Sequence, residues 1–485
     1  MNQPVEIFPL LARELPAEAY LEDVAQTKRF LEYWSADPEF RRRLPEDPQK
    51  VAEEAGLKAD PEAIRPSWDL NWKGDSLSPS MQRYRAFIRE KMGIRPNWRG
   101  SRSLSPAFDA WRQRQINRCF SELGIAKGDA IVHSAAAFEL CRGCSVGCWF
   151  CGIGAKKLAE VWPYTEENGQ LWRGTVQALH DLVGEPAKHG FCYWATDPLD
   201  NPDYERYCID FHDIMGRFPQ TTTAQPLRDP ERIKNLLALS RSRGGEVDRF
   251  SVLSRGTLRK VFETYTAREL LHVELVLQME GNTSSKAFAG NAREHEARYE
   301  RHASQPPQEQ ATGSTIACVS GFLVRMPDRL IELVSPCAAD ARWPLGYRVH
   351  DRRTFDCAQH LREQICNMIS PTQLPMRLGI DAKVRWRKDL RLELCEEGFS
   401  LSTGAMRHDF KNTSFPAMRD LGALLTQGLS AAEVSLQLSE TPVEETLSLL
   451  QKLYMAGLID DEPHFSQRAD DTELKVPPSE ALANA

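Results

Sequence analysis

Residues 141–152 of this chain read Cys141-Arg-Gly-Cys144-Ser-Val-Gly-Cys148-Trp-Phe-Cys151-Gly. Four of the 12 cysteines lie in this stretch, and the last three follow a C-x3-C-x2-C spacing. Thiolates so close together on one loop favour a compact, soft metal centre. Three cysteines would leave one iron of a cubane cluster without a protein ligand, so a small molecule could bind there.

A structural zinc site is the alternative for these cysteines. Cys141-x2-Cys144 and Cys148-x2-Cys151 form two CxxC pairs, but only three residues separate the pairs. Structural zinc sites usually place about 12 or more residues between their pairs, because each knuckle must fold back. The spacing therefore favours an iron–sulfur cluster held by Cys144, Cys148 and Cys151. Cys141 is then expected to be a buried thiol at the end of a strand.

The whole chain has the length and composition of a globular protein with several domains. Its 485 residues suffice for two to four domains, with 41% apolar and 27% charged residues. The net charge of -7 disfavours a nucleic-acid partner held by phosphate contacts. No run approaches the roughly 18 apolar residues of a membrane span, and the first residues lack the features of a signal peptide. We therefore expect a cytoplasmic protein that binds neither membrane nor nucleic acid.

Strand and helix patterns alternate between residues 126 and 375. Six strand positions are expected, at residues 130–140, 190–196, 220–225, 248–254, 271–279 and 316–334, the last a strand pair turning at Pro327-Asp328. Helical crossovers between strands indicate an α/β fold whose parallel sheet curls into a partial (βα)6 barrel. In such barrels the chemistry lies where strands end and loops begin. The strand at 130–140 ends at the cysteine loop.

Other segments flank this expected barrel. Residues 1–75 have short helical patterns, and residues 76–125 read as a linker followed by capping helices. Residues 385–462 combine an alternating strand pair with three helices, which predicts a winged-helix-like α+β domain. Residues 463–485 form a polar tail that is expected to be disordered. The polar stretch at 281–315 could be a lid or a solvated insertion.

The cysteine stretch, with the aromatic Phe150 before its last cysteine, closely resembles the signature of the radical SAM enzymes. This resemblance implies a [4Fe-4S] cluster on Cys144, Cys148 and Cys151, with S-adenosyl-L-methionine (SAM) on the open iron. It places Phe150 among the cofactor-binding residues.

The same resemblance suggests further contacts to SAM. Asp197 follows the strand at 190–196, where radical SAM enzymes keep a Gly-Gly-Glu-like motif that binds the SAM amino group. Asp197 could supply the carboxylate, although the glycines are absent here. Ser254 and Arg255 end the strand at 248–254, where the resemblance implies residues that bind the SAM carboxylate. A surface cation is the alternative for Arg255.

Two further stretches resemble the peptide epimerases of ribosomal natural-product maturation, of the proteusin (polytheonamide) type. They read Thr196-Asp-Pro-Leu-Asp-Asn-Pro202 and Ser335-Pro-Cys337, the latter followed by Trp343-Pro-Leu-Gly-Tyr-Arg348. The similarity spans roughly residues 100–370. It implies that the 5′-deoxyadenosyl radical takes a Cα hydrogen from an L-residue of a precursor peptide. A protein thiol then returns a hydrogen from the opposite face and leaves a D-residue.

Cys337 is the predicted hydrogen donor. It follows a strand and the Pro336 turn, where its side chain could project into the mouth of the barrel. Cys357 is the second candidate, whereas most other cysteines fall within strand or helix patterns typical of core thiols. The later cysteines are too widely spaced for a second cluster, which disfavours crosslinking enzymes with auxiliary clusters.

The resemblance also implies partners, namely a ribosomally synthesised precursor peptide (leader and core) and an electron donor such as flavodoxin or ferredoxin. Residues 385–462 resemble a precursor-recognition element that docks a leader peptide as an added strand. A plain winged helix is the alternative. Part of residues 1–75 resembles the leader-peptide domain named after nitrogen-fixation proteins, with a plain helical cap as the alternative.

Two other functions remain open at this point. The first is another radical SAM peptide-modifying enzyme, either a cyclase or a methyltransferase. The second is a non-catalytic, zinc-stabilised peptide-binding protein.

Overall fold

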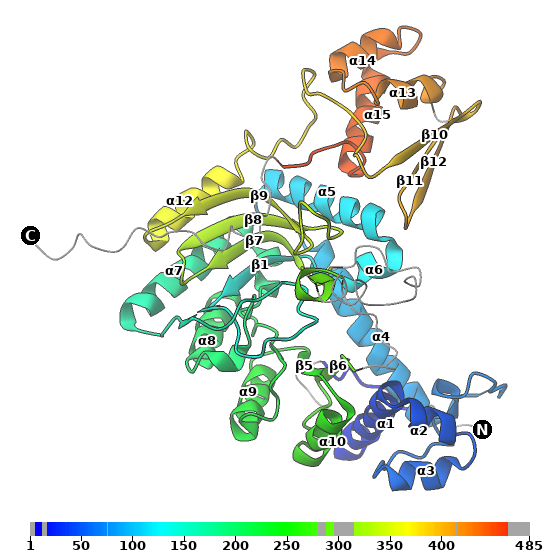
Figure 1. The fold of residues 1–485 in the computed structure, drawn as a ribbon, viewed down its shortest axis with the longest axis vertical. Helices are drawn as coiled ribbons and strands as arrows, with labels where there is room; N and C mark the ends of the chain where they lie inside the picture. The colour runs from blue at the N-terminus through cyan, green and yellow to red at the C-terminus, as the bar shows by residue number, and fades with distance from the viewer. Residues whose placement is uncertain are drawn as a thin grey trace, which may run out of the picture.

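The computed structural model describes residues 5–11, 17–74, 76–279, 288–294, 315–413 and 415–463. Most of the polar stretch at 281–315 and nearly all of the C-terminal tail lie outside these residues. Figure 1 shows the N-terminal helices below, a mixed α/β part in the middle and a smaller C-terminal part above. In the described residues the strands form four sheets.

The largest sheet has the order β1-β7-β8-β9. Its strands are β1 (Ser134–Glu139), β7 (Val319–Arg325), β8 (Leu330–Pro336) and β9 (Tyr347–Thr354). β1 runs parallel to β7, whereas β7, β8 and β9 pair antiparallel. Every residue of β1 and β8 is buried, since helices cover the sheet (Figure 1). The predicted strand pair around Pro327-Asp328 is confirmed as the hairpin of β7 and β8.

A second sheet contains three parallel strands, β4 (Thr222–Thr223), β5 (Asp248–Val252) and β6 (Val273–Leu277). Two helices connect them in turn, α9 (Pro230–Ser242) and α10 (Arg255–Thr264). The strand expected at 190–196 is reduced to one parallel bridge, between Phe191 and Ala137. The α/β class and the parallel βα order of β4, β5 and β6 are therefore as predicted, but the described strands lie in separate sheets and not in one parallel sheet curled into a partial barrel. The 190–196 segment was expected to pair with strands of both sheets, but it pairs over too few residues to join them.

Helices surround these sheets. They are α5 (Pro106–Leu123), α6 (Ile125–Ala130), α7 (Glu166–Val183), α8 (Tyr204–Met215) and α12 (Ala358–Met368), with 3-10 turns η2 (Glu185–His189) and η3 (Pro198–Asp200). Phe108 of α5 stacks on Phe322 of β7, with ring centroids 5.5 Å apart, so α5 packs on one face of the larger sheet. α12 packs beside α7.

The N-terminal helices are α1 (Glu18–Ala36), α2 (Pro38–Arg43) and α3 (Pro48–Glu54), followed by the 3-10 turn η1 (Arg65–Ser67). Asp37 and Asp47 cap α2 and α3, each before a proline in the first turn, a pattern typical of helix starts. Phe30 and Tyr33 share an apolar cluster with Val252 and Leu258, so these helices pack against the β4-β5-β6 sheet.

The region expected to be a linker contains one long helix, α4 (Pro79–Gly100). α4 continues without a break through Gly93 and Pro96. It runs along the side of the molecule, from the N-terminal helices towards α5 and α6 (Figure 1). Among the described residues, no helix is long and apolar enough to cross a membrane.

The C-terminal part has the order of strands and helices expected of a winged helix. Its antiparallel sheet consists of β10 (Arg391–Cys395), β11 (Gly398–Ser402) and β12 (Arg407–Lys411), of which β12 was not predicted. Helices α13 (Met418–Leu424), α14 (Ala431–Gln437) and α15 (Val443–Met455) follow, with a Ser430–Glu433 capping box on α14. Phe399, Leu421 and Leu450 belong to a separate apolar core.

Candidate functional site

The cysteine loop, residues 141–161, begins immediately after β1. β2 (Cys141–Arg142) and β3 (Glu160–Val161) pair antiparallel and close the base of the loop. Cys144 donates its N–H to the Lys156 carbonyl (2.9 Å) and accepts from the Leu158 N–H (3.1 Å). The prediction that a strand leads directly into the cysteines is confirmed. Cys141 is fully buried, as expected of a thiol outside the ligand set.

Cys144, Cys148 and Cys151 are all partly exposed. The Cys151 N–H donates to the Cys148 carbonyl (3.2 Å), and Cys151 Sγ accepts from the Ala155 N–H (3.5 Å). Partial burial, together with the neighbouring thiols, raises the pKa of Cys148 to about 12. Burial likewise raises the pKa of Cys144 to about 11, with smaller contributions from Asp200, Asp197 and Cys151. A cationic metal centre would favour the thiolate forms of these cysteines.

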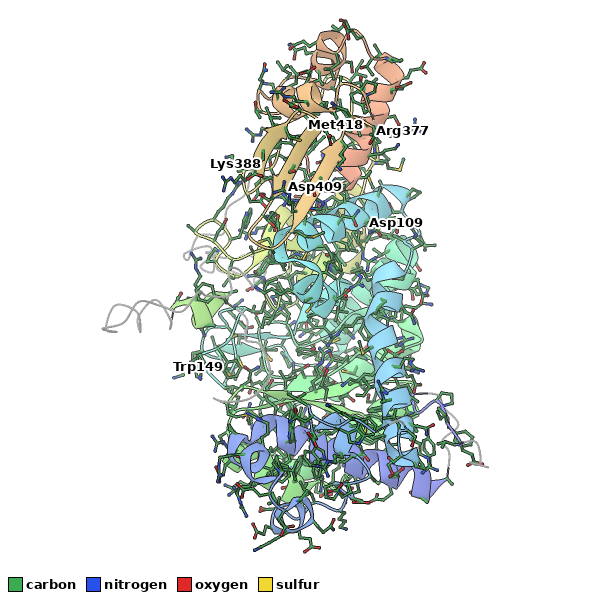
Figure 2. All side chains as sticks on the ribbon, turned by 90° about the vertical axis from the view of Figure 1, so that its right-hand side faces the viewer. Asp109, Trp149, Arg377, Lys388, Asp409 and Met418 are labelled. Atoms are coloured by element: carbon green, nitrogen blue, oxygen red, sulfur yellow. The ribbon has the colours of Figure 1, made fainter. Side chains whose placement is uncertain are left out.

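The described residues contain no group of three or more His, Cys, Asp or Glu side chains arranged to hold a metal ion. The fit of an iron–sulfur cluster therefore rests on the donor chemistry and on the position of the loop. Three thiols on one partly exposed loop, at the carboxyl end of a buried strand, fit such a cluster. Figure 2 places Trp149, between Cys148 and Cys151, at the molecular surface. Phe150 packs edge-on against Trp149, with ring centroids 5.5 Å apart.

Residues 288–294 contact the cysteine loop from a distant part of the sequence. Asn291 donates its N–H to the Cys151 carbonyl (2.9 Å) and its Nδ2 to the Cys148 carbonyl (3.2 Å). Gly290 has φ +54°, and a Cβ there would lie 2.6 Å from the Cys151 carbonyl oxygen. Sequence reasoning missed these residues because they belong to a polar stretch with little apolar pattern.

Asp197 is buried, and its carboxylate accepts hydrogen bonds from within the chain. Thr223 Oγ1 donates to it (2.9 and 3.0 Å), as do the N–H groups of Ala224 (2.8 Å) and Leu199 (3.0 Å). Burial is the main cause of its raised pKa. Asp197 thus joins the end of β4 to η3, at the carboxyl edge of the parallel strands. The predicted contact to the SAM amino group stays a prediction.

Ser254 and Arg255 lie at the same edge, two and three residues beyond β5. Ser254 caps α10 by accepting the Thr257 N–H (3.0 Å), and Arg255 is half-exposed with Nη1 3.8 Å from Asp37. Both parts of the prediction for Arg255, a SAM contact or a surface cation, are compatible with this position.

The position of Cys337 differs from the predicted one. Because β8 runs antiparallel to β7, Pro336 lies at the end of the sheet where β1 begins. The cysteine loop follows β1 at the other end of the sheet. Cys337 is also fully buried, in an apolar cluster with Trp194 and Trp343. The expectation that it projects into an open barrel mouth was wrong. Its role as hydrogen donor stays a prediction.

The cysteine loop nevertheless extends back to the neighbourhood of Cys337. Ile153, two residues after Cys151, packs against the same apolar cluster as Cys337. Cys357, the second candidate, is exposed and precedes α12 just after β9. Thr354, at the end of β9, pairs with Leu330 at the opposite edge of the sheet from Pro336. The two candidate donors therefore lie at opposite ends of the strands of this sheet.

Comparisons with known proteins place the chain in a family. No family model matches the sequence. The chain is 35% identical over 462 residues to the uncharacterized protein y4wI of Sinorhizobium fredii (strain NBRC 101917 / NGR234). That alignment covers 90% of this chain and 88% of the rhizobial protein. The chain belongs to the y4wI family. The cysteine loop and its surroundings therefore describe a candidate site for a member of that family.

Among solved structures, BtrN in complex with AdoMet and 2-DOIA is similar to part of the chain. The match has 17% sequence identity and a TM-score of 0.23, and it covers 30% of this chain. It spans 57% of BtrN, less than two thirds of that protein. A similarity of this extent carries no argument about fold or activity, so the function is inferred from the residues of this chain.

Proposed function

We propose that this member of the y4wI family is a radical SAM peptide epimerase, which converts L-residues to D-residues in a ribosomally synthesised precursor. The observation that carries the proposal is the C-x3-C-x2-C loop, whose three partly exposed thiols lie at the carboxyl end of β1. Three protein thiolates suit a four-iron cluster that keeps one iron open.

In this proposal Cys144, Cys148 and Cys151 hold the [4Fe-4S] cluster. Cluster and SAM together would supply the 5′-deoxyadenosyl radical, with an electron from a donor such as flavodoxin or ferredoxin. Asp197 lies beside the end of β4, and Ser254 and Arg255 follow the neighbouring strand β5, at the carboxyl end of this sheet where SAM contacts are expected. Asp197 would bind the SAM amino group, and Ser254 and Arg255 its carboxylate. Phe150, on the loop itself, would line the cofactor.

We assign the returned hydrogen to Cys337. A planar Cα radical inverts only when its new hydrogen arrives from the face opposite to the abstraction. The S–H bond of Cys337 breaks as the new C–H bond forms, and the resulting thiyl radical takes one electron from the same class of donor and one proton. Burial raises the pKa of Cys337, which keeps the hydrogen on sulfur. Its shared apolar cluster with Ile153 supports a position near the cysteine loop.

The C-terminal sheet is the proposed docking surface for the leader peptide. β10 and β12 are its two edge strands, and all of their residues are exposed or partly exposed. An edge strand offers unpaired N–H and C=O groups to an added strand. We favour this sheet over residues 1–75, because α1–α3 bury apolar side chains against the β4-β5-β6 sheet.

Anaerobic reconstitution followed by reaction in deuterium oxide tests the proposal. The purified chain should bind about four irons, cleave SAM, and introduce one deuterium at each inverted position of its precursor. A product that loses two hydrogens would identify a cyclase, and a product that gains a methyl group would identify a methyltransferase. Bound zinc without iron or SAM cleavage would favour a non-catalytic peptide-binding protein.

A further inference from the structure

Asp200 accepts hydrogen bonds from Ser145, in the middle of the cysteine motif. Its carboxylate accepts the Ser145 N–H at Oδ2 (2.8 Å) and the Ser145 Oγ–H at Oδ1 (2.5 Å). Ser145 lies between Cys144 and Cys148 and is exposed, whereas the Asp200 side chain has an exposed fraction of 0%. The loop is therefore attached at this point to a buried anion.

Arg228 provides the compensating charge for this buried carboxylate. Its Nη1 lies 3.1 Å from Asp200 Oδ1, and its side chain remains half-exposed. An ionised carboxylate is costly to bury unless it is paired and hydrogen-bonded. With Ser145 and Arg228 as partners, the Asp200 carboxylate lies close to the motif.

The residues after Asp200 hold the base of the same loop. Asn201 Nδ2 donates to the carbonyls of Leu140 (3.1 Å) and Trp162 (2.9 Å), which immediately precede and follow the loop. Asp203 Oδ2 accepts the Tyr164 N–H (2.9 Å). Residues 200–203 thus contact the loop in its motif and at both of its ends.

We propose that Asp200 is a positioning residue for the cluster ligands. By fixing the backbone and hydroxyl of Ser145, it orients Cys144 and Cys148 towards a common centre and places a negative charge beside that centre. The part that concerns the cluster rests on the proposed function. The part that concerns the loop rests on the hydrogen bonds of Asp200 alone.

The first experiment measures cysteine alkylation in the cluster-free protein, with peptide mass spectrometry to resolve each thiol. Asp200→Asn should alkylate Cys144 and Cys148 about threefold faster or more than the unmodified chain, because the loop opens more often. The exposed Cys357 and Cys395 should react at unchanged rates, and the buried Cys119 and Cys208 should stay unreactive, which reports that the fold persists. Asp229→Asn is the matched control, since Asp229 caps α9 and lines the same 350 Å³ cavity as Asp200.

A second variant covers the case in which Asp200→Asn does not fold. Ser145→Ala removes the hydroxyl contact at an exposed position and should speed alkylation of the same two cysteines by a smaller factor. In the double variant the two effects should not add, since both remove one interaction. Unchanged alkylation of Cys144 and Cys148 in Asp200→Asn, or in Ser145→Ala when only that variant folds, would overturn the positioning role.

The second experiment measures the reduction potential of the reconstituted cluster by redox titration with electron paramagnetic resonance. Removing a nearby negative charge should raise the potential in Asp200→Asn, and the Asp229→Asn control should match the unmodified chain. An unchanged potential would overturn the electrostatic part of the inference. If the unmodified chain binds no iron, the proposed function fails, and the alkylation rates still decide whether Asp200 positions the loop.

Discussion

Arg348 Nη2 lies 2.7 Å from Glu122 Oε1, and both side chains are almost completely buried. Arg118 Nε donates to the same oxygen of Glu122 (2.9 Å), so this carboxylate joins α5 to β9. Arg348 and Arg118 also pair with Glu462, which follows the last C-terminal helix. Glu462 in turn accepts from the indole N–H of Trp343, in the cluster around Cys337. A buried ionic network thus connects the C-terminal part to the apolar cluster that contains Cys337.

Glu122→Gln should lower the free energy of unfolding by about 3 kcal/mol, since it removes the more deeply buried of the two anions that the guanidinium groups of Arg118 and Arg348 share. Urea denaturation followed by circular dichroism measures the change. Glu167→Gln is the control, because Glu167 pairs with Arg329 but its side chain is 82% exposed. The control should change stability by less than about 0.5 kcal/mol. Equal effects of the two substitutions would contradict the role assigned to the buried network.

The lowered pKa of Glu122 predicts that the fold loses stability in acid. Burial alone would raise the pKa of Glu122. The neighbouring arginines outweigh burial and lower this pKa from 4.5 to about 2. A carboxylate whose folded pKa is lowered stabilises the fold at pH above its unfolded value, and that contribution disappears as pH falls towards the folded value. The urea midpoint should therefore fall between about pH 4.5 and pH 2, and it should fall less in Glu122→Gln. An identical pH profile in both proteins would exclude Glu122 as a source of the dependence.

The sequence predicted the parts of this fold that depend on neighbouring residues. The strand before the cysteines, the β7–β8 hairpin and the proline-containing helix starts each have a local pattern. The pairing of β7 with β1 has none, because these strands lie far apart in the chain. That pairing and the antiparallel direction of β8 set the edge at which Cys337 lies, so the open position expected for it was wrong.

The candidate site likewise contains residues that the sequence predicts and residues that it does not. The spacing of Cys144, Cys148 and Cys151 can be read directly from the sequence, whereas Asn291 contacts Cys148 across 143 positions. Asp200 was visible as a charged residue in a turn, but its contact with Ser145 depends on how the chain folds back after the 190–196 segment. Residues that hold a loop from outside leave no regular pattern in its sequence.

Gly290→Ala should disturb the cysteine loop more than an ordinary glycine substitution. The added Cβ would lie 2.6–2.7 Å from the carbonyl oxygens of Cys151 and Gly152, at a φ of +54°. Gly216→Ala is the control, since Gly216 has φ +74° but no atom within 4 Å of an added Cβ. The control should lose about 1 kcal/mol of stability from backbone strain and keep its iron. Gly290→Ala should retain less iron after reconstitution, and equal iron content in both variants would show that the close approach to Cys151 is not needed for cluster binding.

Cys337→Ala should uncouple radical formation from inversion. The variant should still cleave SAM, because Cys337 is not among the proposed cluster ligands or SAM contacts. It should introduce no deuterium into the precursor in deuterium oxide, since the abstracted position has lost its hydrogen donor. Cys357→Ala provides the matched control, a thiol exposed at the opposite edge of the sheet, and should epimerise at the rate of the unmodified chain. Full deuterium incorporation by Cys337→Ala, together with its loss in Cys357→Ala, would transfer the donor role to Cys357 and to the edge where β1 enters the cysteine loop.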